Sequence, residues 1–131
     1  WMLVVNTNQN LLGKCFLVLR RHSEVVSELS EDEWADLHQQ LRIVSQALIE
    51  AFSPDHFNYA FLQNQDRHVH LHLIPRYSQV QTFAGFQFDD PDYPAHYVVP
   101  GARRSVSEDL LEKIAEEVGT HICTESEHRS L

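Results

Sequence analysis

The sequence predicts an α+β domain, in which an antiparallel β-sheet carries one long and one shorter helix on a single side. Two observations lead to this class. The expected elements follow the order strand, strand, helix, strand, strand, helix, which is typical of such domains. Apolar residues alternate in the clearest strand and recur at steps of three or four in the long helix. The strand–helix–strand order by itself leaves a parallel sheet open.

Size and composition are those of one globular domain that spans residues 1–131. The chain is 43% hydrophobic and long enough to bury a core, and no apolar run approaches the roughly 20 residues of a membrane-spanning helix. The net charge of −9 at pH 7 disfavours a nucleic-acid polymer as partner, because its phosphates need a basic face. A small anion can still bind at a local cationic cluster. Candidates for such a cluster are Arg20, Arg21, Arg67 and Arg76.

Cysteine usage is typical of a cytoplasmic protein. Cys15 and Cys123 are too few for a disulfide framework or a cysteine-based metal site. We expect both to stay reduced, as in the cytoplasm, and no signal peptide is visible.

The first half of the chain predicts a hairpin followed by a long helix. Residues 1–5 (WMLVV) and 14–21 (KCFLVLRR) are apolar runs typical of strands, with an Asn-rich turn between them. Ser30 and Glu33 have the spacing of a capping box, which marks the start of a helix, and Pro54 marks its end. One apolar stripe predicts that this helix packs on the sheet. It comprises Trp34, Leu37, Leu41, Val44, Leu48 and Ala51.

The second half predicts two more strands, an irregular segment and a second helix. Residues 57–62 and 68–75 have the pattern of strands and are joined by a short turn. Residues 79–101 are rich in aromatic residues, Asp, Pro and Gly, which indicates an irregular segment that either covers a pocket or is an ordinary surface connection. The second helix is expected from about residue 107 to 118. The tail from about residue 120 is expected to be mobile.

The stretch HVHLHL at residues 68–73 carries the strongest functional signal, because a histidine stands at every second position. On a strand, His68, His70 and His72 share one face and span roughly 13 Å at about 3.3 Å per residue. The alternate residues are aliphatic, so the opposite face belongs to the core. A solvated strand face would mix Ser, Thr, Lys and Glu, so three identical titratable rings indicate chemistry.

Two kinds of chemistry fit this row of histidines. Imidazoles bind zinc and other divalent metals, but three from one straight strand do not easily converge on an ion with bonds of about 2.0–2.1 Å. A metal site would use two of them and a further ligand, such as His96 or Asp66. Alternatively, a neutral imidazole attacks phosphorus as a nucleophile, and the flanking rings bind the phosphate.

The row and its surroundings resemble the histidine triad (HIT) superfamily. HVHLHLI at residues 68–74 matches the family signature of alternating histidines, and the PRY that follows resembles the fragile histidine triad and diadenosine polyphosphate hydrolase branch. Upstream, LVVNTNQNLLGKCFLVLRRH resembles the first hairpin of the family, with Asn6 seven residues before Gly13, and LSEDEWADL resembles the start of its long helix. The resemblance covers roughly residues 1–77 and implies a single HIT-like domain. Lys14 departs from it, because the branch often has a histidine there.

The resemblance implies a nucleotide hydrolase that cleaves dinucleoside polyphosphates or related nucleoside phosphoesters at the α-phosphate. His70 would be the nucleophile and form a covalent nucleotidyl-histidine intermediate, which water hydrolyses. A hydrogen bond from the other ring nitrogen of His70 to a backbone carbonyl would select the reactive tautomer. His72 would contact the α-phosphate and help the leaving group depart, and His68 would brace the network.

The resemblance also implies the substrate contacts and the assembly. Asn6 would hold the ribose hydroxyls, and Gln63 and Asn64 are candidates for a polar side chain near the scissile bridge, with Asn64 favoured. No metal belongs to the chemical step, although Mg²⁺ can accompany a polyphosphate substrate. A homodimer is expected, because family members pair as two-fold dimers. Three alternatives stay open: nucleotidyl transfer to another acceptor, metal binding by two of the histidines, and non-catalytic nucleotide binding.

Overall fold

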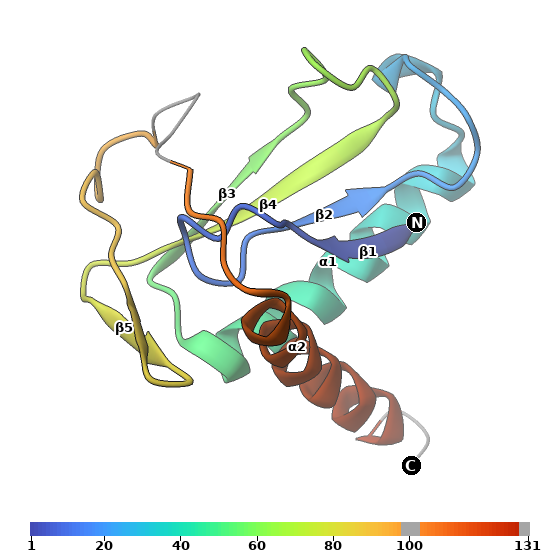
Figure 1. The fold of residues 1–131 in the computed structure, drawn as a ribbon. Coiled ribbons are helices and arrows are strands. Elements are labelled where there is room, and N and C mark those ends of the chain that lie inside the picture. The colour runs from blue at the N-terminus through green and yellow to red at the C-terminus, as the bar shows by residue number, and fades with distance from the viewer. Residues whose placement is uncertain (98–102, 129–131) are drawn as a thin grey trace.

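The computed structural model describes residues 1–97 and 103–128, with side chains up to residue 122 (Figure 1). Its regular structure is a four-stranded sheet, a two-stranded hairpin and two α-helices. In chain order the elements are β1 (Met2–Val5), β2 (Cys15–Val18), a short 3-10 helix (Val26–Glu28), α1 (Glu31–Phe52), β3 (His56–Ala60), β4 (His70–Arg76), β5 (Gln81–Phe83), β6 (Phe86–Phe88) and α2 (Glu108–His128).

The main sheet has the strand order β1-β2-β4-β3, and every neighbouring pair is antiparallel. Strand β4 therefore lies inside the sheet beside β2, although α1 separates the two in the sequence. The register sets Phe16 opposite His72 and Val18 opposite His70. The α+β class with an antiparallel sheet is confirmed, and the helices have 22 and 21 residues.

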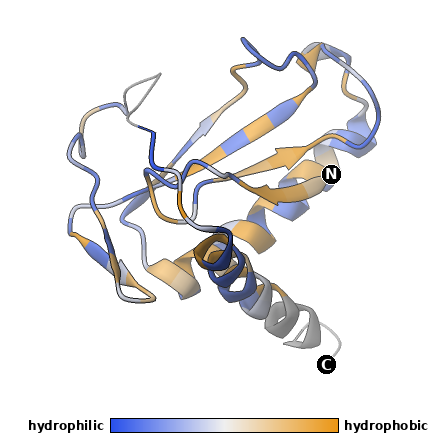
Figure 2. Ribbon diagram, viewed as in Figure 1, coloured by the Kyte–Doolittle hydropathy of each residue, from blue (hydrophilic) through white to orange (hydrophobic). Residues whose placement is uncertain are grey.

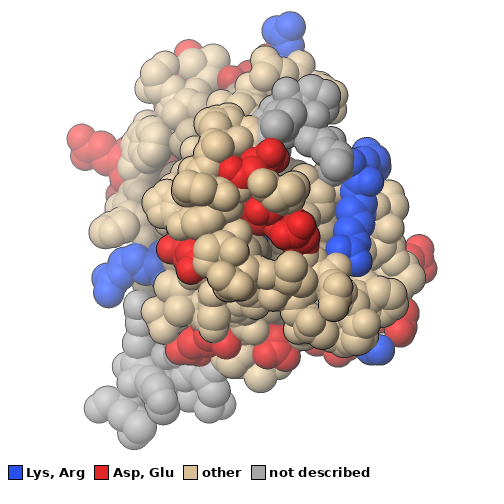
Figure 3. All heavy atoms as spheres, turned by 90° about the vertical axis from the view of Figure 1, so that its left-hand side faces the viewer, with Lys and Arg blue, Asp and Glu red and all other residues tan. Residues whose placement is uncertain are grey.

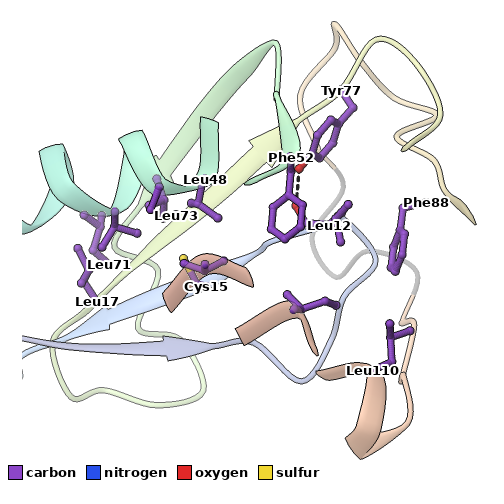
Figure 4. Packing of buried hydrophobic residues seen from close by; sticks show 14 of the residues in the cluster. Leu12, Cys15, Leu17, Leu48, Phe52, Leu71, Leu73, Tyr77, Phe88 and Leu110 are labelled. Atoms are coloured by element: carbon purple, nitrogen blue, oxygen red, sulfur yellow. Dashed lines mark hydrogen bonds between the residues drawn. The ribbon is translucent and has the colours of Figure 1, made fainter. Parts of the chain in front are cut away.

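The core lies between the aliphatic face of the sheet and the two helices (Figure 4). Leu17, Leu71 and Leu73 are at most 3% exposed, and burying each such side chain contributes about 1.5–3 kcal/mol. The helix residues that cover them are Leu37, Val44, Ala47, Leu48 and Phe52 of α1 and Leu110, Ile114 and Val118 of α2. Figure 2 shows the alternation along β4 as bands of apolar and polar colour. Because the leucines of β4 occupy the core face, its histidines belong to the opposite face.

Helix α1 begins and ends as the sequence predicts. The Ser30 hydroxyl accepts from the Glu33 N–H and the Glu33 carboxylate accepts from the Ser30 N–H, which completes the capping box. Ser53 ends the helix in the left-handed conformation, with φ 50°. Trp34 departs from the predicted buried stripe, because its side chain is 42% exposed. It lies in the first turn of α1, where its ring meets the edge of Phe61 at a centroid distance of 6.3 Å.

Two segments are more regular than the sequence indicates. The predicted irregular segment contains the β5–β6 hairpin, whose turn residues Ala84 and Gly85 have φ of 50° and 82°. Ala-Gly is a weaker hairpin signal than Asn-Gly, so the sequence alone does not indicate this turn. Helix α2 continues to His128, beyond the predicted end at about residue 118. No proline interrupts it, and Gly119 costs only about 1 kcal/mol within a helix.

The parts of the prediction at residues 98–101 and 129–131 lie outside the described residues. Within the described part of the chain, neither helix is both long and apolar enough to cross a bilayer.

Candidate active site

A cavity of about 570 Å³ lies on the histidine face of the sheet. Strands β2 and β4, the loop of residues 6–14 and the turn of residues 62–66 line it, together with Tyr97 and Arg103. All six residues that the sequence assigns to the site line this cavity. They are His68, His70, His72, Asn6, Gln63 and Asn64.

His70 is the central histidine of the row and is held through one ring nitrogen. Its Nδ1 lies 2.6 Å from the backbone oxygen of His68, so the hydrogen bond to a backbone carbonyl that the sequence analysis expects is present. Because a carbonyl oxygen only accepts, Nδ1 carries the proton, and the neutral ring keeps its lone pair on Nε2. Phe16 packs edge-on against the ring at a centroid distance of 5.6 Å. The arrangement fits an imidazole that is prepared to act as a nucleophile.

His72 lies next to His70 and stays uncharged over a wide pH range. Its ring centroid is 4.9 Å from that of His70 and 4.8 Å from that of Phe16. Burial, followed by the nearby charges of His70 and Lys14, lowers the pKa of His72 to about 4. A neutral His72 can donate one N–H to a phosphate oxygen without placing a positive charge beside His70.

His68 lies just before β4, which begins two residues later than predicted, at His70. The backbone between them bonds to the segment after β2 and does not continue the regular ladder. The Nε2 of His68 lies 2.5 Å from the Leu19 carbonyl oxygen, to which it donates. The Asp66 carboxylate accepts from the His68 N–H at 3.0 Å, and His22 stacks on the ring with centroids 5.4 Å apart. His68 therefore braces the site, and its carbonyl holds His70.

The loop of residues 6–14 is built around the side chain of Gln9, which carries no motif signal in the sequence. Gln9 is 0% exposed, and its amide nitrogen donates to the carbonyls of Asn6 at 2.7 Å and Lys14 at 2.8 Å. Its amide oxygen accepts from the Gly13 N–H at 2.9 Å. The Asn6 side chain accepts from the Asn8 N–H at 2.9 Å. These bonds fix the backbone from which Asn6 and Lys14 reach the cavity.

The two amide candidates in the turn have different surroundings. Gln63 donates to the backbone oxygens of Glu24 at 2.9 Å and Arg67 at 2.7 Å and has a positive φ of 51°, so its side chain holds the turn together. Asn64 is exposed at the cavity. Its side chain makes no hydrogen bond to any described residue, so Asn64 stays a candidate for contact with a ligand.

The positive charges at the cavity are not the predicted ones. The four arginines named as candidates do not line it; they are Arg20, Arg21, Arg67 and Arg76. Arg76 is instead buried against Asp90, with Nε 2.8 Å from the carboxylate. The cavity receives Lys14 from the 6–14 loop and Arg103 from the segment before α2. Figure 3 shows, on one face, a strip of basic side chains beside a separate group of acidic ones. Part of the surface is therefore locally positive although the net charge of the chain is negative.

The segment between β6 and Tyr97 is fastened to the end of β4 by Arg76. The guanidinium donates to the Asp90 carboxylate, to the Asn58 side-chain oxygen at 2.7 Å and to the Ala95 carbonyl at 2.8 Å. Tyr97, at the end of this fastened segment, lines the cavity. Of the two interpretations of residues 79–101, the described part therefore favours the one in which the segment contributes to a pocket.

The metal interpretation finds little support in the geometry. Within the described residues, no group of three or more His, Cys, Asp and Glu side chains is arranged to hold a metal ion. His96, one of the two further ligands considered, does not line the cavity. Asp66 does line it, but its carboxylate accepts from the His68 N–H.

Comparison with known proteins gives similarity at the level of structure. No family model and no curated protein matches the chain. A histidine triad (HIT) protein from Sinorhizobium meliloti has a TM-score of 0.75 at 21% identity and covers 91% of this chain and 81% of its own. A histidine triad protein from Marinobacter aquaeolei has a TM-score of 0.75 at 20% identity, with coverages of 93% and 82%.

A third solved structure, of a hypothetical histidine triad nucleotide-binding protein from Sulfolobus tokodaii, has a TM-score of 0.73 at 18% identity. It covers 93% of this chain and 77% of its own. At these identities the likeness concerns the fold. The chain therefore has the fold of the histidine triad proteins, as the resemblance in its sequence implies.

Proposed function

We propose that the chain is a histidine triad nucleotide hydrolase that cleaves dinucleoside polyphosphates or related nucleoside phosphoesters at the α-phosphate. The observation that carries this proposal is the 2.6 Å hydrogen bond between Nδ1 of His70 and the His68 carbonyl. It assigns the proton to Nδ1 and leaves the Nε2 lone pair of a neutral ring for attack. The solved structure named as nucleotide-binding supports a nucleotide as the ligand.

The reaction takes place in two displacements at phosphorus. Nε2 of His70 forms a bond to the α-phosphorus, the bond from phosphorus to the bridging oxygen breaks, and that oxygen leaves with the electron pair. Water then forms a new phosphorus–oxygen bond and loses its proton, while the phosphorus–nitrogen bond breaks. The nucleoside monophosphate is released and His70 is restored. Each step has a lower barrier than direct attack by poorly activated water.

The neighbouring residues bind and orient the substrate. His72, whose pKa of about 4 keeps it neutral near pH 7, donates an N–H to the α-phosphate. His68 orients His70 through its backbone oxygen. Asn6 binds the ribose and Asn64 lies by the scissile bridge, which accords with their positions at the cavity. Mg²⁺ accompanies a polyphosphate substrate and takes no part in the displacement.

The experiment is an assay of AMP release from diadenosine triphosphate by the wild type and by His70→Ala. We expect no detectable release by the variant, because it lacks the side chain that forms the covalent intermediate. His38→Ala is the matched control, since His38 is an exposed histidine of α1 and its loss should leave the rate unchanged. Circular dichroism checks that both variants are folded. Turnover by folded His70→Ala at the wild-type rate would reject the mechanism.

The same assay separates hydrolysis from transfer. With inorganic phosphate present, a nucleotidyl transferase would convert the intermediate into a second ADP and form no AMP, whereas a hydrolase forms one AMP for each ADP that is released as the leaving group. We propose hydrolysis as the main reaction, with transfer as the alternative at the same site.

We also propose that the chain forms a homodimer. Strand β3 is an edge of the sheet. Two exposed side chains with apolar surface are Tyr59 of β3, at 52%, and Ile49 of α1, at 43%. Such side chains favour association with a second copy. Light scattering should give twice the chain mass of 15.2 kDa, and a monomer at micromolar concentration would contradict this.

A further inference from the structure

We propose that Lys14 and Arg103 form a second anion-binding subsite in the triad cavity, which holds a phosphate group of the substrate other than the one attacked. The inference rests on the proposed function, since it takes the attacked phosphate to lie at His70. The substrate class is then that of nucleotides with at least two phosphate groups. The second phosphate is either joined to the α-phosphate as an anhydride or carried on the ribose.

The register of the sheet places Lys14 diagonally beyond His72, on the same face. Phe16 is the Cα partner of His72, and Lys14 stands two residues before Phe16. The pairing of the hairpin extends this far, because the Asn6 N–H donates to the Lys14 carbonyl at 3.0 Å. Residues two apart on an extended strand share a face, so Lys14 continues the row of polar residues beyond His72. It lines the same cavity.

Two positive side chains meet at this end of the cavity without an acidic partner. Burial and then the charge of Arg103 lower the pKa of Lys14 to about 8, so the two cations lie close enough to repel each other. Neither forms an ion pair with a carboxylate among the described residues. The Lys14 ammonium donates to the side-chain oxygen of Asn10 at 2.6 Å, which orients the charge but does not neutralise it. A phosphate between the two side chains would accept from both.

The cavity is polarised along the histidine row. Lys14 and Arg103 lie at the end beyond His72, whereas the carboxylate of Asp66 lies at the opposite end, bonded to the backbone of His68. His72 stands between Lys14 and His70 in this row, so a phosphate at His70 and His72 leaves Lys14 for another group. The second phosphate therefore belongs at the Lys14 end.

Because of this subsite, kcat/KM should depend on pH in the alkaline range. The titratable groups that act on Lys14 are Arg103 and the imidazole of His72, and Tyr97 lines the same cavity. Lys14 carries its charge below its pKa of about 8 and loses it above. Since kcat/KM reports the ionisation of the free enzyme, kcat/KM for a substrate with two phosphates should fall as pH rises through about 8.

The test compares three adenine nucleotides. The p-nitrophenyl ester of AMP has one phosphate, diadenosine triphosphate has two further phosphates linked as anhydrides, and the 3′-phosphorylated nitrophenyl ester has one further phosphate on the ribose. Lys14→Met should lower kcat/KM for one of the two larger substrates about tenfold more than for the simple ester. The substrate that is affected identifies where the second phosphate is carried. Equal changes for all three substrates, or no change for any, would overturn the subsite.

Two control variants sharpen the result. Lys14→Arg keeps a cation at high pH, so it should retain the selectivity and remove the fall near pH 8. Lys113→Met removes the other lysine of the chain, which is exposed on α2 and pairs with Asp109, and should change neither rate nor selectivity.

A binding measurement separates failure of the subsite from failure of the proposed function. Calorimetry with inorganic pyrophosphate needs no turnover, and Lys14→Met should bind it at least about fivefold more weakly than the wild type or Lys113→Met. If the wild type cleaves none of the three nucleotides, the proposed function fails and this measurement still decides the subsite. The subsite would be overturned if the wild type does not bind pyrophosphate, or if the wild type and Lys14→Met bind it with equal affinity.

Discussion

Gly13 is the point at which the loop that carries Asn6 and Lys14 packs against α1. Its φ is +84°, and a Cβ atom there would lie 2.9 Å from Cδ2 of Phe52 and 3.1 Å from Cδ2 of Leu48. Gly13→Ala combines left-handed backbone strain of about 1–2 kcal/mol with overpacking of about 1–3 kcal/mol. We therefore expect the free energy of unfolding to fall by about 2–5 kcal/mol. Urea titration followed by circular dichroism measures it, with an unchanged m-value.

Gly85→Ala is the matched control for this prediction. Gly85 has nearly the same φ, +82°, but a Cβ atom there meets nothing within 4 Å. Its substitution should cost only the strain of about 1–2 kcal/mol. If the two variants lose the same stability, the packing of the loop against Phe52 and Leu48 contributes nothing and the reasoning is wrong.

Three further substitutions probe the buried residues Asp90 and Gln9 and the half-buried His72. Asp90→Ala leaves the Arg76 guanidinium buried without its carboxylate and should lower the free energy of unfolding by about 3–5 kcal/mol; a loss under 1 kcal/mol in urea titration would contradict this. Gln9→Leu removes the hydrogen bonds that hold the 6–14 loop and should weaken nucleotide binding in calorimetry, so unchanged affinity would argue against a role for this loop. The fold lowers the pKa of His72 from 6.5 to about 4; in that window the unfolded chain takes up the proton first, and stability falls as pH falls. His72→Gln should flatten this slope, and an unaltered slope would show that His72 does not cause it.

The features that the sequence predicts well depend on residues that are close together in the chain. The capping box at Ser30 and Glu33 depends on a spacing of three, and the alternation of β4 depends on a period of two. Each pattern indicates which face of its element is buried, so the sheet, the long helix and the histidine face can be predicted from these patterns. The tautomer of His70 is also local, because its partner is the carbonyl two residues earlier.

The features that the sequence hides depend on distant contacts. Tyr97 reaches the cavity at the end of the segment that Arg76 fastens to β4. Arg103 reaches it beside Arg104, whose backbone bonds to Asn8 and Gln9. Nothing in the neighbouring residues indicates either contact. Gln9 has the composition of a turn residue, and only its burial reveals that it holds the loop. Arg76 has the composition of a surface cation, yet Asp90 neutralises it in the interior. Tertiary packing decided these positions.

The most direct measurement is mass spectrometry of the protein quenched during turnover of diadenosine triphosphate. The account predicts an adenylyl group on the peptide that contains residues 68–74, attached to His70 and absent from His70→Ala. An adenylyl group on another residue, or an unmodified protein quenched during a burst of AMP release, would contradict it.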